Sequence, residues 1–254
     1  MKSVIKRYLE KFNIIKPQSN PQTNIDNFPE IDLDARNIIS KVQNYTMTSV
    51  ERRFALINTI RYISTNQIAG DIVECGVWKG GSMMAVAYTL IQMEDLGRDL
   101  HLFDTFSGMA EPSEKDISIS GTLATHELNN TKKEDEKSVW CYADLETVRT
   151  ALYSTDYPKE KIHFIQGKVE DTIPDRAPDQ IALLRLDTDW YESTRHELEH
   201  LFPRIVEGGV IIIDDYGHWQ GAKQAVDEYI QKYKIRILLN RIDYTGRIAI
   251  VNHS

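Results

Sequence analysis

The sequence predicts a doubly wound α/β fold, in which helices cover both faces of a mostly parallel sheet. Short and nearly continuous apolar runs, such as DIVEC and IALLRL, are typical of strands that are buried on both faces. Segments with helical periodicity, such as GSMMAVAYTLIQM, separate these runs, and this alternation predicts right-handed crossovers between parallel strands. With 254 residues, of which 41% are hydrophobic, the chain can form one large domain with its own core.

We expect residues 1–44 to form a helical arm and linker, and residues 45–254 to form the main domain. Apolar residues at helical spacing among lysines predict a short basic amphipathic helix at the start of the arm: Val4, Ile5, Tyr8, Leu9 and Phe12. This helix is a candidate for docking on the body or on a second copy of the chain, rather than on a membrane surface. The polar, proline-containing stretch 17–29 predicts a linker.

The elements of the main domain follow in order along the chain. Thr48 and Glu51 have the capping-box spacing, so a helix is expected to begin near Thr48. The strand-like runs DIVEC, LHLFD, IHFIQ, IALLRLD and VIIID come next, and helical segments separate several of them. The chain closes with KIRILLN and GRIAIVN, which the short connection RIDYT separates. This pair predicts an antiparallel hairpin at the edge of the sheet.

One segment, residues 109–144, breaks this rhythm. It is rich in charged and polar residues and has little periodicity. Loops of this length in compact domains are usually functional or disordered. We therefore expect a mobile insert that acts as a lid over a binding site.

Charge and composition exclude several classes of partner. The formal net charge of −8 argues against a nucleic acid bound through a broadly basic surface. There is no apolar stretch near the roughly 20 residues that a membrane-spanning helix needs, so no stable membrane insertion is expected. With no clean signal-peptide pattern either, a cytoplasmic location is expected. Cys75 and Cys141 are too few for a disulfide framework, and we expect both to be reduced.

The ends of the first two strand-like runs indicate a ribose-bearing ligand with an amino-acid part. Gly76, Gly80 and Gly81 lack the G-x-G-x-x-G spacing of a pyrophosphate site. Glu74 lies instead beside the start of a helix, where its carboxylate could accept a hydrogen bond from an ammonium group. Asp104 ends the second run, and a carboxylate there can accept both hydroxyls of a ribose.

Four carboxylates end the later runs, at Asp187, Asp189, Asp214 and Asp215. Adjacent parallel strands would place them close together, and like charges at that distance require a compensating cation. An oxygen-only set of ligands favours Mg²⁺, or Mn²⁺, over zinc. The alternative is that some of these side chains only cap the following helices.

The segment HELEH, residues 196–200, matches the H-E-x-x-H signature of zinc proteases. At helical spacing its histidines lie opposite the apolar face, and we expect them to face water. A zinc site there is therefore disfavoured.

Several segments together resemble the macrocin O-methyltransferase family, the Mg²⁺-dependent sugar methyltransferases that use S-adenosyl-L-methionine. They are DIVECGVWKGGS, FDTFSGM, GKVEDTIP, LLRLDTDWYEST and GGVIIIDDYGHWQGAKQAVDEY. The resemblance runs from about Tyr45 to the C-terminus. It implies a Rossmann-like class I methyltransferase sheet of seven strands and methylation of a sugar hydroxyl on a glycosylated natural product or another saccharide.

The resemblance also implies roles for individual residues. Asp189 corresponds to the general base, and Asp187, Asp214 and Asp215 correspond to the metal ligands. Residues matching the cofactor site are Thr46, Met47, Glu74, Cys75, Gly76, Val77, Trp78, Asp104, Thr105, Phe106, Ser107, Gly108, Glu170, Asp171 and Thr188. We consider three further residues as candidates for substrate contact: Trp190, Tyr216 and His218.

Two other functions remain open on the sequence. Asp187-x-Asp189 resembles the metal motif of nucleotide-sugar glycosyltransferases, which would bind a nucleotide diphosphate with Mn²⁺. A methyltransferase-like scaffold that binds the cofactor without catalysis is the second alternative. Intact carboxylates at the strand ends argue against such a scaffold.

Overall fold

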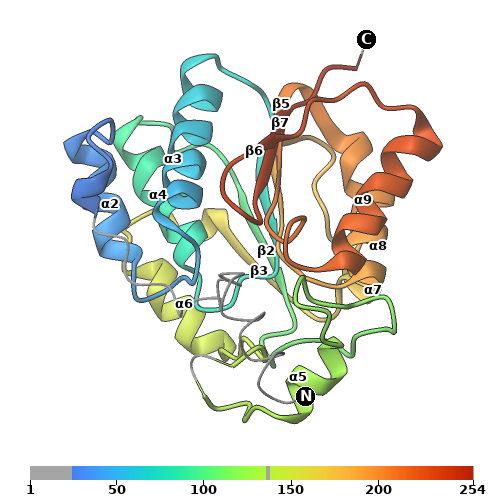
Figure 1. Cartoon of the computed structure of the whole chain (residues 1–254). Helices are drawn as coiled ribbons and strands as arrows, with labels where there is room; N and C mark the ends of the chain where they lie inside the picture. Colours follow the sequence, from blue (N-terminus) through green and yellow to red (C-terminus); the bar gives the residue numbers. More distant parts are fainter. Residues whose placement is uncertain (1–24, 136–137, 254) are drawn as a thin grey trace, which may run out of the picture.

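The computed structural model describes residues 25–135 and 138–253 (Figure 1). The basic amphipathic helix expected in the first sixteen residues lies outside these ranges. The elements described before the first strand are η1 (Ile25–Asn27), α2 (Leu33–Val42) and α3 (Val50–Thr65). Within the described ranges, no helix has the length and apolar character needed to cross a bilayer.

A seven-stranded sheet forms the centre of the molecule, in the order β3-β2-β1-β4-β5-β7-β6. The strands are β1 (Asp71–Cys75), β2 (Leu100–Asp104), β3 (Ile162–Gln166), β4 (Ile181–Leu186), β5 (Ile205–Ile213), β6 (Asn240–Arg241) and β7 (Arg247–Ile250). The pairs among β1 to β5 are parallel, whereas β7 pairs antiparallel with both β5 and β6. The predicted doubly wound sheet with an antiparallel C-terminal hairpin is thus confirmed.

Helices cover both faces of this sheet (Figure 1). Alternate strand residues point to opposite faces, so Ile72 belongs to one core cluster and its neighbour Val73 to the other. The first face packs against α2, α3, α4 (Gly81–Gln92) and α6 (Leu145–Tyr153). The second face packs against α7 (Val169–Thr172), α8 (Tyr191–Leu201) and α9 (Gln220–Tyr233). Two short 3₁₀ helices, η2 (Lys159–Lys161) and η3 (Phe202–Arg204), precede β3 and β5.

Helix α3 begins at Val50, close to the expected position, but its N-cap is Ser49. The Ser49 side chain accepts a hydrogen bond from the backbone N–H of Arg52. The expected cap, Thr48, lies one residue earlier, and its hydroxyl shares a hydrogen bond of 2.9 Å with the Thr46 hydroxyl. Because Thr48 is engaged there, the cap falls to the next residue with a side-chain oxygen.

Helix α2 is part of the core, although its residues were expected to belong to the arm. Its buried side chains Ala35, Ile38 and Ile39 join the cluster on the first face of the sheet. Asp32 caps the helix and forms an ion pair with Arg61 of α3. Apolar burial and an ion pair therefore hold this segment on the body of the molecule.

The hairpin is shorter than the expected run KIRILLN, because β6 contains only Asn240 and Arg241. Ile235, Ile237 and Leu239 still pack on the second core cluster, partly buried. Partly buried and exposed residues alternate in this segment, as they would in a strand packed on one face.

The insert 109–144 contains a short helix, α5 (Ala124–Asn129), which lies with the insert beside the carboxyl ends of the strands (Figure 1). Ser118 of the insert forms an isolated antiparallel bridge with Trp219. A small third core cluster joins α5 to the body through Trp190 and Trp219.

Candidate active site

A cavity of about 320 Å³ opens at the carboxyl ends of the parallel strands. Strand ends, the segment before α3 and both ends of the insert line this cavity. In open α/β sheets, this is the edge at which ligands bind, because loops from several strands meet there. The described structure therefore places its main cavity where the strand-end residues predicted a site.

Glycine at position 76 brings the first strand end close to the fourth. A Cβ atom on Gly76 would lie 2.1 Å from the carbonyl oxygen of Asp187, and the backbone φ is +83°. Only glycine can occupy such a position without a shift of the backbone. The turn at the start of α4 also lies against the segment before α3, since the Gly81 N–H donates a hydrogen bond of 2.9 Å to the Tyr45 carbonyl. This contact brings residues 45–48 to the cavity.

Asp104, at the end of β2, organises the adjacent loops. Its carboxylate accepts hydrogen bonds from the backbone N–H groups of Val77, Trp78 and Phe106 at 2.6, 3.2 and 2.7 Å. Burial raises the pKa of Asp104, and these three donors oppose the rise. A carboxylate has about four acceptor positions, so it can accept one further hydroxyl from a ligand in the cavity.

A buried arginine, Arg185 of β4, lies among the strand-end carboxylates. Its side chain pairs with Glu74 at 2.6 Å, with Asp187 at 2.7 Å and with Asp214 at 2.6 Å. It therefore supplies part of the compensating positive charge that the carboxylates require. Arg185 was not among the predicted site residues, although an arginine inside the apolar run IALLRL is a recognisable signal.

Glu74 faces Arg185 and is not among the residues that line the cavity. Burial raises the pKa of Glu74 to about 7, although the charge of Arg185 opposes the rise. Its second oxygen, Oε2, is buried without a hydrogen-bond partner among the described residues. An ammonium group would have to reach this oxygen to bind as the sequence suggested.

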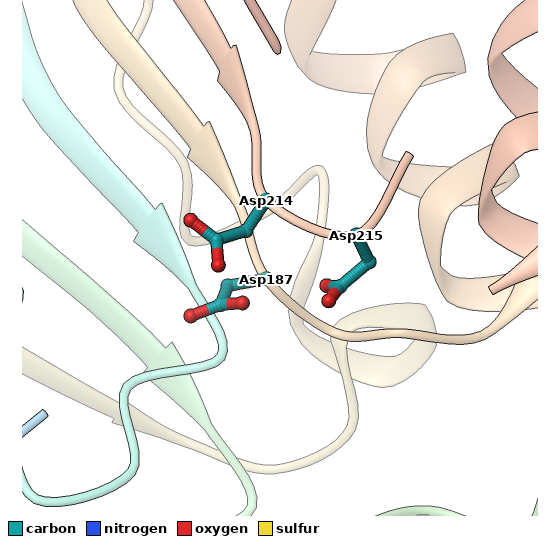
Figure 2. A group of neighbouring side chains, drawn as sticks. All are labelled: Asp187, Asp214 and Asp215. Atoms are coloured by element: carbon teal, nitrogen blue, oxygen red, sulfur yellow. The ribbon is translucent and has the colours of Figure 1, made fainter. Parts of the chain in front are cut away.

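Asp187, Asp214 and Asp215 converge at the ends of β4 and β5, as Figure 2 shows. Each offers one carboxylate oxygen to a group in which all such oxygens lie within 4.8 Å of one another. Burial raises the pKa values of Asp187 and Asp215 well above the usual range. Burial also acts to raise the pKa of Asp214, but Arg185 and Arg52 outweigh it and lower the value. The oxygen-only donor set fits a hard divalent cation.

Asp189 lines the same cavity two residues after Asp187. Its φ of +68° lies in the left-handed region, which aspartate tolerates better than most residues. Burial raises the pKa of Asp189 to about 7; a hydrogen bond with Asp215 opposes the rise, and the charge of Asp187 adds to it. A carboxyl group with this pKa can accept a proton near neutral pH.

The structure brings most of the other predicted site residues to this cavity. Those that line it are Thr46, Met47, Gly76, Val77, Trp78, Asp104, Thr105, Gly108, Glu170, Thr188 and His218. Besides Glu74, six predicted residues do not line it: Cys75, Phe106, Ser107, Asp171, Trp190 and Tyr216.

Local packing explains these exceptions. Cys75 and Phe106 point into core clusters, and Ser107 is exposed. The Tyr216 hydroxyl donates to Asp227 at 2.7 Å. Trp190 is buried, donates to the Ala110 carbonyl at 2.9 Å and packs edge-on against Trp219.

Trp219, which packs against Trp190, lines the cavity, although of these two tryptophans we expected Trp190 to contact the substrate. Asp171 and Trp190 both line a smaller neighbouring cavity of about 250 Å³.

The HELEH segment does not form a zinc site in the described structure. The rings of His196 and His200 lie 4.4 Å apart, but among the described residues only the aspartate group offers three metal-ligating side chains together. The histidines are partly buried rather than fully solvated, since His196 hydrogen-bonds to the Ile173 carbonyl at 3.0 Å. Glu197 is fully buried and accepts a hydrogen bond from Thr188 at 2.9 Å.

Comparison with solved structures defines the class of the fold. The O-methyltransferase NovP superposes with a TM-score of 0.69 and 29% sequence identity, covering 82% of this chain and 83% of that chain. A calicheamicin methyltransferase has a TM-score of 0.63 at 16% identity, covering 87% and 93%, and shows the likeness of the fold. The fold is that of the class I O-methyltransferases.

The family follows from the sequence comparison. A model of the macrocin-O-methyltransferase (TylF) family matches residues 7–249, and the chain belongs to this family. It is 32% identical over 202 residues to a demethyldecarbamoylnovobiocin O-methyltransferase from Streptomyces niveus, covering 80% of this chain and 74% of that protein. It is 27% identical over 202 residues to a mycinamicin III 3''-O-methyltransferase from Micromonospora griseorubida, covering 80% and 76%.

The protein is therefore an S-adenosylmethionine-dependent O-methyltransferase, as the resemblance implied. The glycosyltransferase and scaffold alternatives are set aside, because the family match extends over the strand ends on which they depended.

Proposed function

We propose that the enzyme methylates a sugar hydroxyl of a glycosylated small molecule, with the aspartate group holding a divalent cation and Asp189 accepting the proton. The observation that carries the proposal is that one cavity is lined by Asp189, by the three grouped aspartates and by the strand ends suited to the cofactor. A donor, a cation and a base can therefore meet at one acceptor oxygen.

The relatives support the class of acceptor. One relative is named a 4'-O-methyltransferase of a rhamnosyl tetracenomycin from Streptomyces olivaceus, and it is 32% identical over 202 residues. The substrate in this name is a tetracenomycin that carries a rhamnosyl group. By analogy, we expect the acceptor here to carry a sugar that enters the cavity while the rest of the molecule remains near the insert.

Cofactor binding is assigned to the ends of β1 and β2. We expect Asp104 to accept a ribose hydroxyl and the loop Gly76–Trp78 to border the methionine part, because both line the cavity. Thr46 and Met47 close the cavity from the side of α3, and Glu170 borders it from α7. These residues orient the cofactor without supplying chemistry of their own.

The divalent cation, Mg²⁺ or Mn²⁺, would be held by Asp187, Asp214 and Asp215. When bound, such a cation lowers the pKa of a coordinated hydroxyl and stabilises developing negative charge on its oxygen. The three aspartates fit this purpose because their oxygens lie within 4.8 Å of one another and two of them are largely buried.

Asp189 removes the hydroxyl proton, and this removal makes the acceptor oxygen nucleophilic. The Asp189 carboxylate would accept the hydroxyl proton as the acceptor oxygen bonds to the methyl carbon. The bound methyl donor would supply this carbon and keep the carbon–sulfur electron pair, leaving as a neutral thioether. General-base assistance of this kind contributes roughly 10² to 10⁴ in rate. Five residues of the insert line the cavity: Met109, Ala110, Ser138, Val139 and Cys141. We propose that the insert acts as a lid that excludes water.

A screen of glycosylated acceptors with S-adenosylmethionine tests the proposal. The expected result is the gain of one methyl group on a sugar by mass spectrometry, with the activity lost in EDTA and restored by Mg²⁺. Matched aglycones serve as the control and should not be methylated. Methylation that resists EDTA would overturn the role of the cation, and methylation of the aglycones would overturn the sugar acceptor.

A further inference from the structure

Arg52 of α3 reaches the aspartate group from outside the sheet. Its side chain is 14% exposed and forms an ion pair with Oδ2 of Asp214 through Nη1. Its Nε atom lies 3.0 Å from Oδ2 of Asp243, in the hairpin turn. Arg52 therefore lies between two carboxylates, of which only Asp214 belongs to the aspartate group that we assign to the cation.

Asp243 is a rigid second partner. Its Oδ1 atom accepts the backbone N–H groups of Thr245 and Gly246 at 2.9 and 2.7 Å. Its Oδ2 atom accepts the hydroxyl of Ser49 at 2.8 Å, and Ser49 is the N-cap of the helix that carries Arg52. Because these bonds fix the carboxylate, it can keep Arg52 anchored when the contact with Asp214 is lost.

The two guanidinium groups at Asp214 are not equivalent. Arg185 binds Oδ1 of Asp214 and also holds Glu74 and Asp187, so it ties three strand ends together in the interior. Arg52 binds only Oδ2 of Asp214 within this group, and it has Asp243 as an alternative partner. A cation that takes up Oδ2 would therefore displace Arg52 and leave Arg185 in place.

We propose that Arg52 is a positioning residue that competes with the divalent cation for Oδ2 of Asp214. The inference rests on the proposed cation site. In the metal-free enzyme, Arg52 neutralises Asp214 and holds it at the site. When the cation enters, the guanidinium moves toward Asp243, and the cost of breaking the Asp214 contact weakens metal binding. The residue therefore sets the affinity of the site for the cation.

Titration with Mn²⁺ alone tests this competition, with the concentration of free Mn²⁺ measured by electron paramagnetic resonance. Arg52→Met removes the competing charge and should bind Mn²⁺ about tenfold more tightly, which corresponds to about 1.4 kcal/mol. Arg52→Lys keeps a cation near Asp214 and should restore an affinity close to that of the wild type. Arg61→Met removes the same charge from the same helix at its ion pair with Asp32, and should leave the affinity unchanged.

Arg52→Gln provides a polar variant in case the methionine variant does not fold, and circular dichroism checks the fold of both. Weaker or unchanged Mn²⁺ binding in the folded Arg52→Gln or Arg52→Met variants, with normal binding in the wild type, overturns the competition and leaves the cation site standing. Binding in neither wild type nor variants overturns both proposals. Mn²⁺ binding by the Arg52 variants but not by the wild type supports the competition, because Arg52 would then exclude the cation from the site.

Discussion

Replacement of Arg185 by methionine tests whether the buried charge network holds the strand ends together. Arg185 is 4% exposed and pairs with Glu74, Asp187 and Asp214. Removing one member of a buried ion pair costs about 3–5 kcal/mol, because the remaining charges are left without compensation. In a chain of this size each kcal/mol lowers the melting temperature by roughly 2–4 °C, so we expect a decrease of about 6–20 °C.

The pH dependence of this variant has a definite sign. The pKa of Glu74 is already raised to about 7 from 4.5 in the presence of Arg185, and loss of the arginine raises it further. Between the unfolded and folded pKa values, the folded protein binds a proton that the unfolded chain releases. The free energy of unfolding therefore falls as the pH rises through this window, by at most about 1.4 kcal/mol per pH unit for one group.

Thermal melts and urea denaturation at pH 5 and pH 8, both without divalent cations, measure the two effects. We expect Arg185→Met to lose more stability than the wild type between these two pH values. Arg195→Met is the control, since Arg195 is 43% exposed and its loss should change stability by less than about 0.5 kcal/mol. A melting temperature within 2 °C of the wild type, with no added pH dependence, would refute the reasoning.

Three further predictions concern single residues. Asp189→Asn should bind S-adenosylhomocysteine and Mn²⁺ normally in calorimetric titrations but lose roughly 10² to 10⁴ in single-turnover rate; an unchanged rate would remove Asp189 as the base. Gly76→Ala should lose at least about 2 kcal/mol in chemical denaturation, because its Cβ meets the Asp187 carbonyl at 2.1 Å; wild-type stability would contradict the close packing.

Asp32→Ala should lose about 1–2 kcal/mol at pH 7, because the N-cap of α2 and the ion pair with Arg61 both disappear. The pKa of Asp32 is lowered, so this contribution is present above its ordinary pKa of 3.8 and is lost as the pH falls through the lower folded value. The difference from the wild type should shrink in urea melts carried out at progressively lower pH, and a difference that grew instead would contradict the assignment.

The strand ends were predictable because their geometry follows from periodicity. Parallel strands direct their carboxyl ends to one edge, so Asp104, Asp187 and Asp214 could be assigned to a common site from the alternation of strands and helices alone. The antiparallel hairpin was predictable for a similar reason, since two apolar runs with a short connection have few alternatives. These patterns are local in the sequence, so they can be recognised without knowledge of any distant contact.

The partners of these carboxylates were decided only by the tertiary structure. Arg52 lies 162 residues from Asp214 in the chain, and its contact depends on how α3 packs beside the hairpin. Glu74 faces Arg185 because side chains on adjacent strands share one face of the sheet, and register, not composition, chooses such neighbours. Trp219 rather than Trp190 borders the cavity because the insert covers Trp190. The sequence by itself thus determined which groups gather at the sheet edge, while packing determined which charges neutralise them.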